Sequence, residues 1–407
     1  MRTWAQALLA MAVITPAAAQ TTGEFFADNS IHEIRIDINP ADWNRLKANF
    51  RSNDYYNVVW RWRNQTIENV GIRSSGLGSR SPIKPNLRVD FDRFEDLQFL
   101  GLKSVKLDAN SQDSSQMRER VTMRFFERLG LPASRETHAR LFVNNQYIGL
   151  YAVVESVDKE FLRQRFGQND GHLYEYNYAF SFHFEYLGSD PAKYSPILFE
   201  PKTHEKDPDP RPLEAWIRTV NQASDGDFER AAGEYIDLRK FLTHLAGEMY
   251  LAEVDGILGD LGMANLYLYR FERSNRHQFI VWDKDNTFSN PFRDILRNAN
   301  DHVLMRRTLA VPALRNFYLS ELVRAASLAG GSGGWMEQEI NRVYGQVRQA
   351  ALDDPNKQCP AQEFPPGTGL RPCTNADFER GAENLRLFTR DRGDFVTVGP
   401  LTAVRHD

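Results

Sequence analysis

Residues 255–288 begin Asp255-Gly-Ile-Leu-Gly-Asp-Leu-Gly-Met-Ala-Asn265, continue Leu266-Tyr-Leu-Tyr-Arg-Phe271 and, after a polar turn, end Phe279-Ile-Val-Trp-Asp283-Lys-Asp285-Asn-Thr-Phe288. The alternating, Leu- and Tyr-rich run 266–271 predicts a β-strand, and the run 277–282 predicts a second one. The short polar turn between them, residues 272–276, makes the pair a hairpin.

Four polar side chains stand at the ends of the two predicted strands. Asp255 and Asn265 lie on the loop that enters the first strand, and Asp283 and Asp285 follow the second. Because a hairpin brings these ends together, we expect the four side chains to converge. Their oxygens suit a hard cation such as Mg²⁺, and one aspartate could act as a base for a hydroxyl group. The alternative is that these residues only bend the backbone, since Asp and Asn are common in turns.

The composition is that of a globular chain with a substantial core. The chain has 407 residues, 42% of them hydrophobic and 12% aromatic, which is enough for one large or two ordinary domains. The net charge is −4 and no long basic run is present, which argues against nucleic acid as the main partner.

The first 19 residues have the pattern of a secretory signal peptide. Arg2 precedes an apolar run that ends in Ala17-Ala18-Ala19, so we expect cleavage near Ala19 and a mature net charge of −5. A membrane anchor is the alternative, but the apolar run is too short to span a bilayer comfortably. We therefore expect a secreted protein, periplasmic or extracellular, with no membrane span after signal removal.

The two cysteines lie in one Pro- and Gly-rich segment. In an exported chain, Cys359 and Cys373 suggest one disulfide that closes a surface loop. Two free thiols are the alternative.

Periodicity and capping residues predict further elements along the chain. The sequence predicts a strand at 31–38, a helix from Pro40 capped by Asn39, and two hairpins, 55–62 with 65–73 and 138–143 with 147–154. The predicted later helices are 117–129, 212–223, 226–235, 238–251, 311–328, 335–351 and 375–392.

A glycine-rich loop follows the first predicted hairpin. Backbone N–H groups in such a loop can cradle a phosphate, and guanidinium groups match phosphate oxygens. The candidate phosphate-binding residues are Arg73, Gly76, Gly78, Ser79, Arg80 and Lys84, with Arg88 nearby. A bulged hairpin with solvated charges is the alternative.

Two glutamates, Glu155 and Glu119, are candidate partners for these cations. Glu155 stands where a strand leads into a helix, so it could pair with Lys84 or with an arginine of the loop. It could equally be an acid favoured by the helix dipole. For Glu119, in the predicted helix 117–129, we expect a solvated side chain.

Taken together, these motifs resemble the CotH kinase family, spore coat protein H-like proteins with an atypical protein-kinase-like fold. The resemblance covers about residues 31–395, and it rests on the order and spacing of several short motifs. These are Gly71-Ile-Arg73 with Gly76, Ser79-Arg80 and Lys84; Gly149-Leu-Tyr151 with Glu155 and Asp158-Lys159; Asp255-Gly256 with Asn265; Trp282-Asp283 with Asp285 and Phe288; and Asp353-Asp354-Pro355. The sequence departs from the family at Ile83-Lys84-Pro85-Asn86, where the family usually has two lysines.

The resemblance implies a site for ATP and Mg²⁺, with Mn²⁺ as an alternative ion. Asp255 then corresponds to the catalytic base, and the metal ligands are Asn265, Asp283 and Asp285. Lys84, Arg73 and Arg80 would neutralise phosphates, and Glu155 would position Lys84.

We therefore expect an α+β, bilobal, atypical kinase-like fold. A mostly antiparallel sheet lobe with a helix spans 24–200, and a mostly helical lobe that carries the catalytic hairpin spans 212–395. The expected function is transfer of the γ-phosphoryl group of ATP to Ser or Thr of a protein substrate by a monomer. The alternatives are a non-catalytic envelope-assembly protein on the same scaffold and a metal-dependent phosphohydrolase.

Overall fold

The N-terminal part of the chain forms a closed β-barrel. The computed structural model describes residues 20–27, 31–362 and 369–398. After the short helix α1 (Thr22–Phe25), seven strands form the barrel in the order β1-β2-β3-β4-β5-β7-β6. Their bounds are β1 (His32–Ile38), β2 (Tyr56–Trp62), β3 (Gln65–Ser74), β4 (Leu87–Asp90), β5 (Ser104–Asp108), β6 (Glu136–Val143) and β7 (Gln146–Glu155).

Alternating side chains explain how the barrel forms. In β1 the residues Ile34, Ile36 and Ile38 are buried, while those between them are partly solvated, which is the period of a strand with one buried face. Neighbouring barrel strands are antiparallel except for β1 and β6, whose parallel pairing closes the ring. The helix α2 (Pro40–Ala48) begins as predicted, because Asn39 Oδ1 accepts the N–H of Ala41 at 2.9 Å.

A second sheet of four strands contains the predicted hairpin. Its order is β11-β10-β8-β9, with β10 (Leu266–Arg270) and β11 (His277–Val281) antiparallel, so the predicted hairpin is confirmed. The strands β8 (His172–Tyr176) and β9 (Phe199–Pro201) extend this sheet. Strand β8 lies within the segment 24–200 and β9 begins at its end, so part of that segment pairs with the hairpin and not with the barrel.

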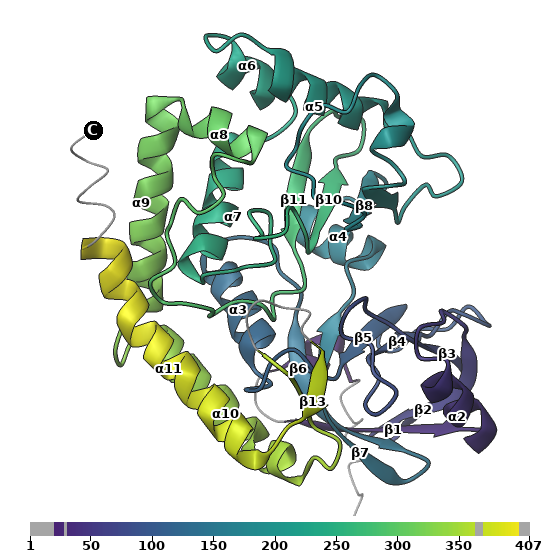
Figure 1. The fold of residues 1–407 in the computed structure, drawn as a ribbon. Coiled ribbons are helices and arrows are strands. Elements are labelled where there is room, and N and C mark those ends of the chain that lie inside the picture. Colours follow the sequence, from purple (N-terminus) through teal and green to yellow (C-terminus); the bar gives the residue numbers. More distant parts are fainter. Residues whose placement is uncertain (1–19, 28–30, 363–368, 399–407) are drawn as a thin grey trace, which may run out of the picture.

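Helices surround this second sheet (Figure 1). The central one is α7 (Leu238–Tyr250), in which every residue from Phe241 to Tyr250 is buried. A helix that is buried on all sides is typical of the middle of a core. The other helices are α3 (Arg118–Arg128), α4 (Lys159–Phe166), α5 (Arg211–Gln222), α6 (Phe228–Gly233), α8 (Val303–Leu309), α9 (Pro312–Ala329), α10 (Trp335–Asp353) and α11 (Asn375–Val398), and η1 (Pro191–Lys193) is a short 3₁₀ turn.

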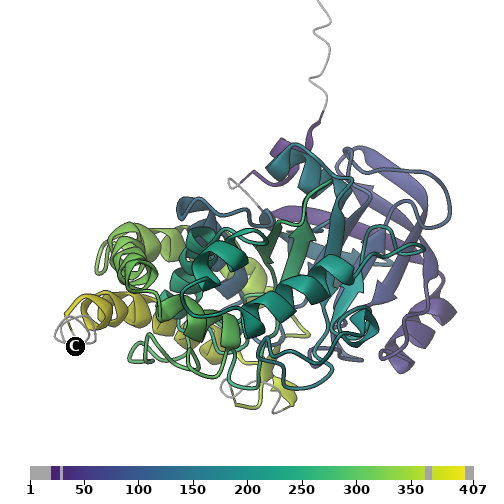
Figure 2. The same ribbon diagram turned by 90° about the horizontal axis from the view of Figure 1, so that it is seen from above.

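The whole is a mixed α+β fold with a β-rich N-terminal part, as expected. Seen from above, the barrel lies on one side and the later helices on the other (Figure 2). The long helices α10 and α11 pack together, and α10 also contacts β7 of the barrel. Between α10 and α11, the short strands β12 (Gln358–Pro360) and β13 (Leu370–Pro372) pair. The predicted disulfide Cys359–Cys373 is present there.

Two other expectations concern the membrane and the N-terminus. Among the described residues, no helix has both the length and the apolar character needed to cross a bilayer. The predicted signal peptide, residues 1–19, lies outside the described residues.

Candidate active site

The hairpin brings together residues from both of its ends. Leu266 pairs with Val281, so Asn265 and Asp283 lie close to each other at the same edge of the sheet. Both adopt a left-handed backbone, with φ of +52° each, which is uncommon for residues other than glycine. The Asn265 amide donates hydrogen bonds of 2.9 Å to the backbone oxygen and to the carboxylate of Asp255.

Strand β5 of the barrel adds a lysine and a third aspartate to this edge. The Lys106 ammonium lies 2.9 Å from a carboxylate oxygen of Asp108 and 3.4 Å from one of Asp283. Val105 and Leu107 are fully buried in the barrel core. Because side chains alternate along a strand, Lys106 and Asp108 point out of the barrel toward the hairpin.

Helix α3 supplies a glutamate to the same cluster. One carboxylate oxygen each from Asp108, Glu119 and Asp283 lies within 4.8 Å of the other two. The expectation of a solvated Glu119 is wrong, because only 3% of this residue is exposed. Its Oε1 atom is buried without a hydrogen-bond partner among the described residues. Carboxylate oxygens are the ligands that a divalent cation prefers, but here the Lys106 ammonium already lies against two of the three acids.

The electrostatic environment of the cluster is set by burial and by its like charges. The pKa of Glu119 is raised well above its usual range, mainly because the side chain is buried and secondly because the carboxylate of Glu136 is near. The pKa of Asp285 is also raised well above its usual range, mainly by burial and secondly by the charge of Asp283. For Lys106, burial acts in the opposite direction, but Asp108 and Asp283 together carry its pKa well above the ordinary value. Lys106 is therefore a permanent cation among acids that would otherwise repel one another.

The end of α7 holds the loop that carries Asp255. Glu248 forms a buried ion pair of 2.8 Å with Lys284 and accepts the N–H of Ile257 at 2.9 Å. Lys284 also donates to the backbone oxygen of Asn265 at 2.9 Å. A Cβ atom at Gly256 would lie 2.7 Å from the Glu248 carboxylate, so only glycine fits there. Burial raises the pKa of Asp255, Lys284 opposes the rise and Asp283 adds to it.

Helix α3 also supports the segment that follows Asp283. The hydroxyl groups of Thr122 and Thr287 share a buried hydrogen bond of 2.9 Å. Arg118 donates to the backbone oxygen of Asp285 at 3.3 Å. Asp285 itself is buried, and its carboxylate accepts a hydrogen bond from Asn286. The helix that provides Glu119 therefore also positions the segment 283–287.

The sequence matches the family described as "CotH kinase protein" over residues 72–396. The chain belongs to the CotH kinase family. It is 24% identical over 346 residues to the inner spore coat protein H of Bacillus subtilis (strain 168), a match that covers 80% of this chain and 90% of that protein.

Two solved structures were also found to be similar to this CotH kinase family member. The complex of HipA, HipB and operator DNA from Shewanella oneidensis MR-1 matches with a TM-score of 0.35 and 13% identity, over 72% of this chain and 57% of that chain. The Helicobacter pylori proinflammatory kinase CtkA matches with a TM-score of 0.32 and 10% identity, over 79% and 94%.

The glycine-rich loop between β3 and β4 lies beside the turn that follows Asp108. The Ser111 hydroxyl donates to the backbone oxygen of Ser79 at 3.2 Å. Gly76 has a φ of +92°, and a Cβ atom there would lie 2.6 Å from Ser79 Oγ, so the loop requires glycine at this position. Nothing lies within 4 Å of a Cβ atom at Gly78. The loop therefore stands at the Asp108 end of the cluster.

The guanidinium groups of this loop are largely occupied by the protein itself. Arg80 donates to the backbone oxygens of Gly76 and Ser52, at 2.6 and 3.0 Å. Arg73 donates to the side chain of Asn53 and to Tyr55. In this structure both arginines brace the loop.

Lys84 and Glu155, which we expected to form a pair, are not brought together. Lys84 is fully buried, and its ammonium lies 2.8 Å from Asp354 at the end of α10. Glu155 instead pairs with Arg135 and Arg165. The expected pairing is therefore corrected, because each partner already has a different counter-ion.

The lysine and the glutamate beside Asp283 are instead Lys106 and Glu119, which the sequence interpretation did not select. A recognisable signal was present in β5, where two charged residues alternate with Val105 and Leu107. Such a pattern marks one polar face on a strand whose other face is in the core.

Proposed function

We propose that this chain is an exported, Mg²⁺-dependent protein kinase that transfers the γ-phosphoryl group of ATP to a Ser or Thr hydroxyl of a protein. The observation that carries the proposal is the convergence of Lys106, Glu119 and Asp283 from three separate elements. In protein kinases a strand lysine, a helix glutamate and a metal-binding aspartate must be in place together. Membership of the CotH kinase family supports the same assignment.

Each residue has a distinct role in the proposed reaction. Asp255, oriented by Asn265, accepts the proton of the substrate hydroxyl as its oxygen attacks the γ-phosphorus. The bond from that phosphorus to the bridging oxygen breaks, and ADP leaves. Lys106 holds phosphate oxygens, and Asp108 and Asp283 balance its charge, with Glu119 of α3 as a neighbouring acid.

The metal ligands in this proposal come from the hairpin and its continuation. Asp283 and Asn265 are the principal ligands, and Asp285 stands beside them. Bound Mg²⁺ would neutralise charge on the phosphates. The backbone of Gly76, Gly78 and Ser79 would cover the phosphates from the barrel side.

A non-catalytic scaffold is the second candidate. The printed name of the B. subtilis relative is that of a spore coat protein, which favours a role in assembly. Export through the proposed signal peptide would also place the chain where ATP is scarce. A chain with this role would bind nucleotide at most, and would transfer no phosphate.

The test is incubation of the purified mature chain with γ-labelled ATP, Mg²⁺ and a mixture of candidate acceptor proteins. We expect labelled Ser or Thr in an acceptor. Asp255→Asn should lower the rate by at least about a hundredfold while nucleotide still binds, because a positioned base contributes 10²–10⁴-fold. Asp301→Asn, at an exposed aspartate outside the site, is the matched control.

Different outcomes separate the candidates. If Asp255→Asn labels the acceptor as fast as the parent chain, Asp255 is not the base. If Asp283→Ala leaves Mg²⁺-dependent nucleotide binding unchanged in calorimetry, Asp283 is not a metal ligand. Nucleotide binding without transfer supports the scaffold, and free phosphate without labelled protein supports a phosphohydrolase.

A further inference from the structure

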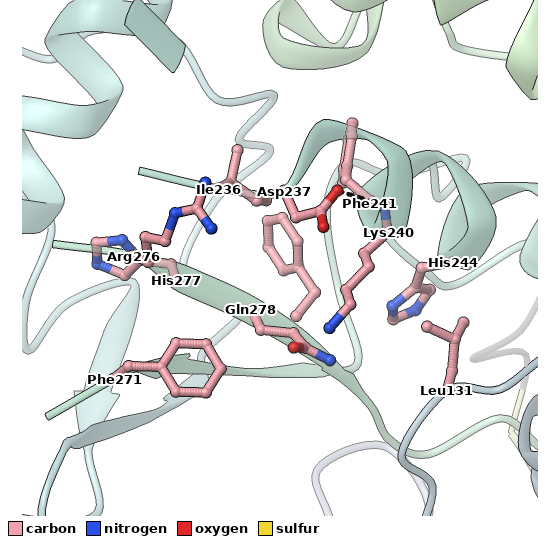
Figure 3. A pocket seen from close by; sticks show the side chains of 11 residues that line it. Leu131, Ile236, Asp237, Lys240, Phe241, His244, Phe271, Arg276, His277 and Gln278 are labelled. Carbon is pink, nitrogen blue, oxygen red and sulfur yellow. Dashed lines mark hydrogen bonds between the residues drawn. The ribbon is translucent and has the colours of Figure 1, made fainter. Parts of the chain in front are cut away.

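A cavity of about 170 Å³ lies near the turn of the β10–β11 hairpin, at the end opposite to Asp283. Figure 3 shows the side chains that line it. Its walls come from the first residues of β11, the first turns of α7 and Leu131, which follows α3. Gln278 is five positions before Asp283, so along a strand the two lie roughly 17 Å apart. The cavity is therefore separate from the proposed active site, although the same elements build both.

The cavity has an apolar wall of aromatic rings. Phe241, Phe271 and Phe279 line it together with Leu131 and Ile236. An engineered cavity of about 150 Å³ with a similar apolar lining binds benzene. A space of this size and character therefore suits one six-membered ring.

Two polar groups extend into the same space, as Figure 3 shows. Gln278 keeps only 9% of its surface, and its side-chain amide has no hydrogen-bond partner among the described residues. Neither amide atom is among the described buried side-chain atoms that lack a partner, so the amide reaches the open space of the cavity, where a ligand can bond to it. Lys240 forms no ion pair with any carboxylate in the described part of the chain.

The charged groups at the cavity edge favour an anion over a cation. The Asp237 carboxylate is occupied as the cap of α7, where it accepts the N–H groups of Arg239 and Lys240 at 3.0 and 3.1 Å. Arg276 also lines the cavity, and within the described ranges its guanidinium donates to one group, the backbone oxygen of Gly233, at 3.2 Å. His244 is held by Glu248 at 3.3 Å.

Lys240 and Gln278 also border a second, neighbouring cavity of about 360 Å³, together with Leu131. Its lining includes Arg165 and Phe166. A ligand whose acidic group sits at this border could extend a further substituent into the second space.

We propose that this cavity is a binding site for a small organic carboxylate with a single apolar ring. The carboxylate accepts hydrogen bonds from the Lys240 ammonium and the Gln278 amide. The ring packs against Phe241, Phe271 and Phe279. This inference does not depend on the proposed kinase activity.

The test uses benzoate as the probe, titrated into the mature chain and followed by calorimetry and ligand-detected NMR. We expect saturable binding at one site. Benzamide, which has the same shape without the charge, should bind at least about tenfold more weakly, because a charge-assisted hydrogen bond is roughly twice as strong as a neutral one. Lys240→Met should weaken benzoate binding to a similar degree, and Gln278→Leu should weaken it several-fold.

The matched control is Lys206→Met, which removes an exposed lysine that does not line the cavity. It should bind benzoate as the parent does, and thermal unfolding should show that all variants are folded. Equal binding by Lys240→Met, equal affinity for benzamide or no saturable binding of benzoate would each overturn the assignment.

Discussion

A fully buried lysine, Lys84, and a partly buried one, Lys106, show how much the surroundings of a single residue matter. Lys84 and Lys106 both have carboxylate partners, yet Lys84 is sealed against Asp354, whereas Lys106 faces Asp108 and Asp283 at the cluster. Lys84 also donates to the backbone oxygens of Ala109 and Leu150, which uses its donors within the protein. Of these two lysines, Lys106 is therefore the one that we assign to phosphate binding in the proposed reaction.

We predict that Lys106→Met lowers phosphoryl transfer by about 100- to 1,000-fold, since that is the usual cost of losing one group that stabilises transition-state charge. The measurement is the initial rate of acceptor labelling. Lys103→Met is the control, because Lys103 precedes the same strand but pairs with Asp92 on the surface. An active Lys106→Met variant would remove Lys106 from the site.

The buried pair Glu248–Lys284 predicts a pH effect on stability. Burial favours protonation of Glu248, but Lys284 and His244 outweigh it and lower its pKa from the ordinary 4.5 to about 2. A depressed carboxylate pKa stabilises the fold above the unfolded pKa, and that stability is lost as the pH falls from about 4.5 toward 2. The loss is on the order of 3 kcal/mol.

Urea unfolding of the parent chain and of Glu248→Gln at pH 5 and pH 3 measures this effect. We expect the parent to lose more stability than the variant between the two pH values, because only the parent can protonate at this position. The same pH dependence in both proteins would show that Glu248 is not responsible.

At the scale of elements, the close packing of α7 against α3 fixes the positions of Glu119 and Glu248 relative to each other. A Cβ atom at Gly247 of α7 would lie 2.6 Å from Phe126 Cε1 and 2.8 Å from Leu129 Cδ1 of the α3 region. Glycine therefore allows the two helices to pack closely, and the ends of these helices carry Glu119 and Glu248.

We predict that Gly247→Ala destabilises the fold by about 1–3 kcal/mol, because an extra methyl group overpacks this contact. Gly345→Ala in α10 is the control, since nothing lies within 4 Å of its Cβ position. That exposed substitution should stabilise by about 0.5–1 kcal/mol through helix propensity. Chemical denaturation measures both, and equal effects would contradict the packing argument.

At the scale of the whole molecule, the end of α10 ties the helices to the barrel. The Asp354 carboxylate forms an ion pair with the Lys84 ammonium at 2.8 Å. It also accepts a hydrogen bond from the N–H of Leu150 in β7 at 3.0 Å. Both charged side chains are fully buried. Asn356 adds a hydrogen bond to the backbone oxygen of Ile148.

We predict that Lys84→Met destabilises the protein by about 3–5 kcal/mol, because it leaves the charge of Asp354 buried without its partner. The double variant Lys84→Met/Asp354→Leu should lose much less, since replacing both charges removes that penalty. Urea unfolding of the parent, both single variants and the double variant gives the coupling free energy between the two side chains. Additive losses would contradict a direct ion pair.

Local patterns predicted much of this fold correctly. The hairpin, the cap at Asn39 and the long later helices depend on residues that are near one another in the chain, so their periodicity and turn chemistry suffice. The closure of the barrel by β1 and β6, and the pairing of β8 with β10, join distant segments, and no local pattern encodes them.

The candidate site likewise contains contacts that the local sequence predicts and contacts that only the tertiary structure determines. The contact of Asp255 with Asn265 follows from a loop and the strand that it enters, so the sequence was enough to anticipate it. The choice between Lys84 and Lys106 was not local, because Lys106 meets Asp283 from 177 positions away and Lys84 meets Asp354 from 270. An ion pair depends on distance in space, and for such remote partners that distance exists only once the barrel has closed and packed against the helices.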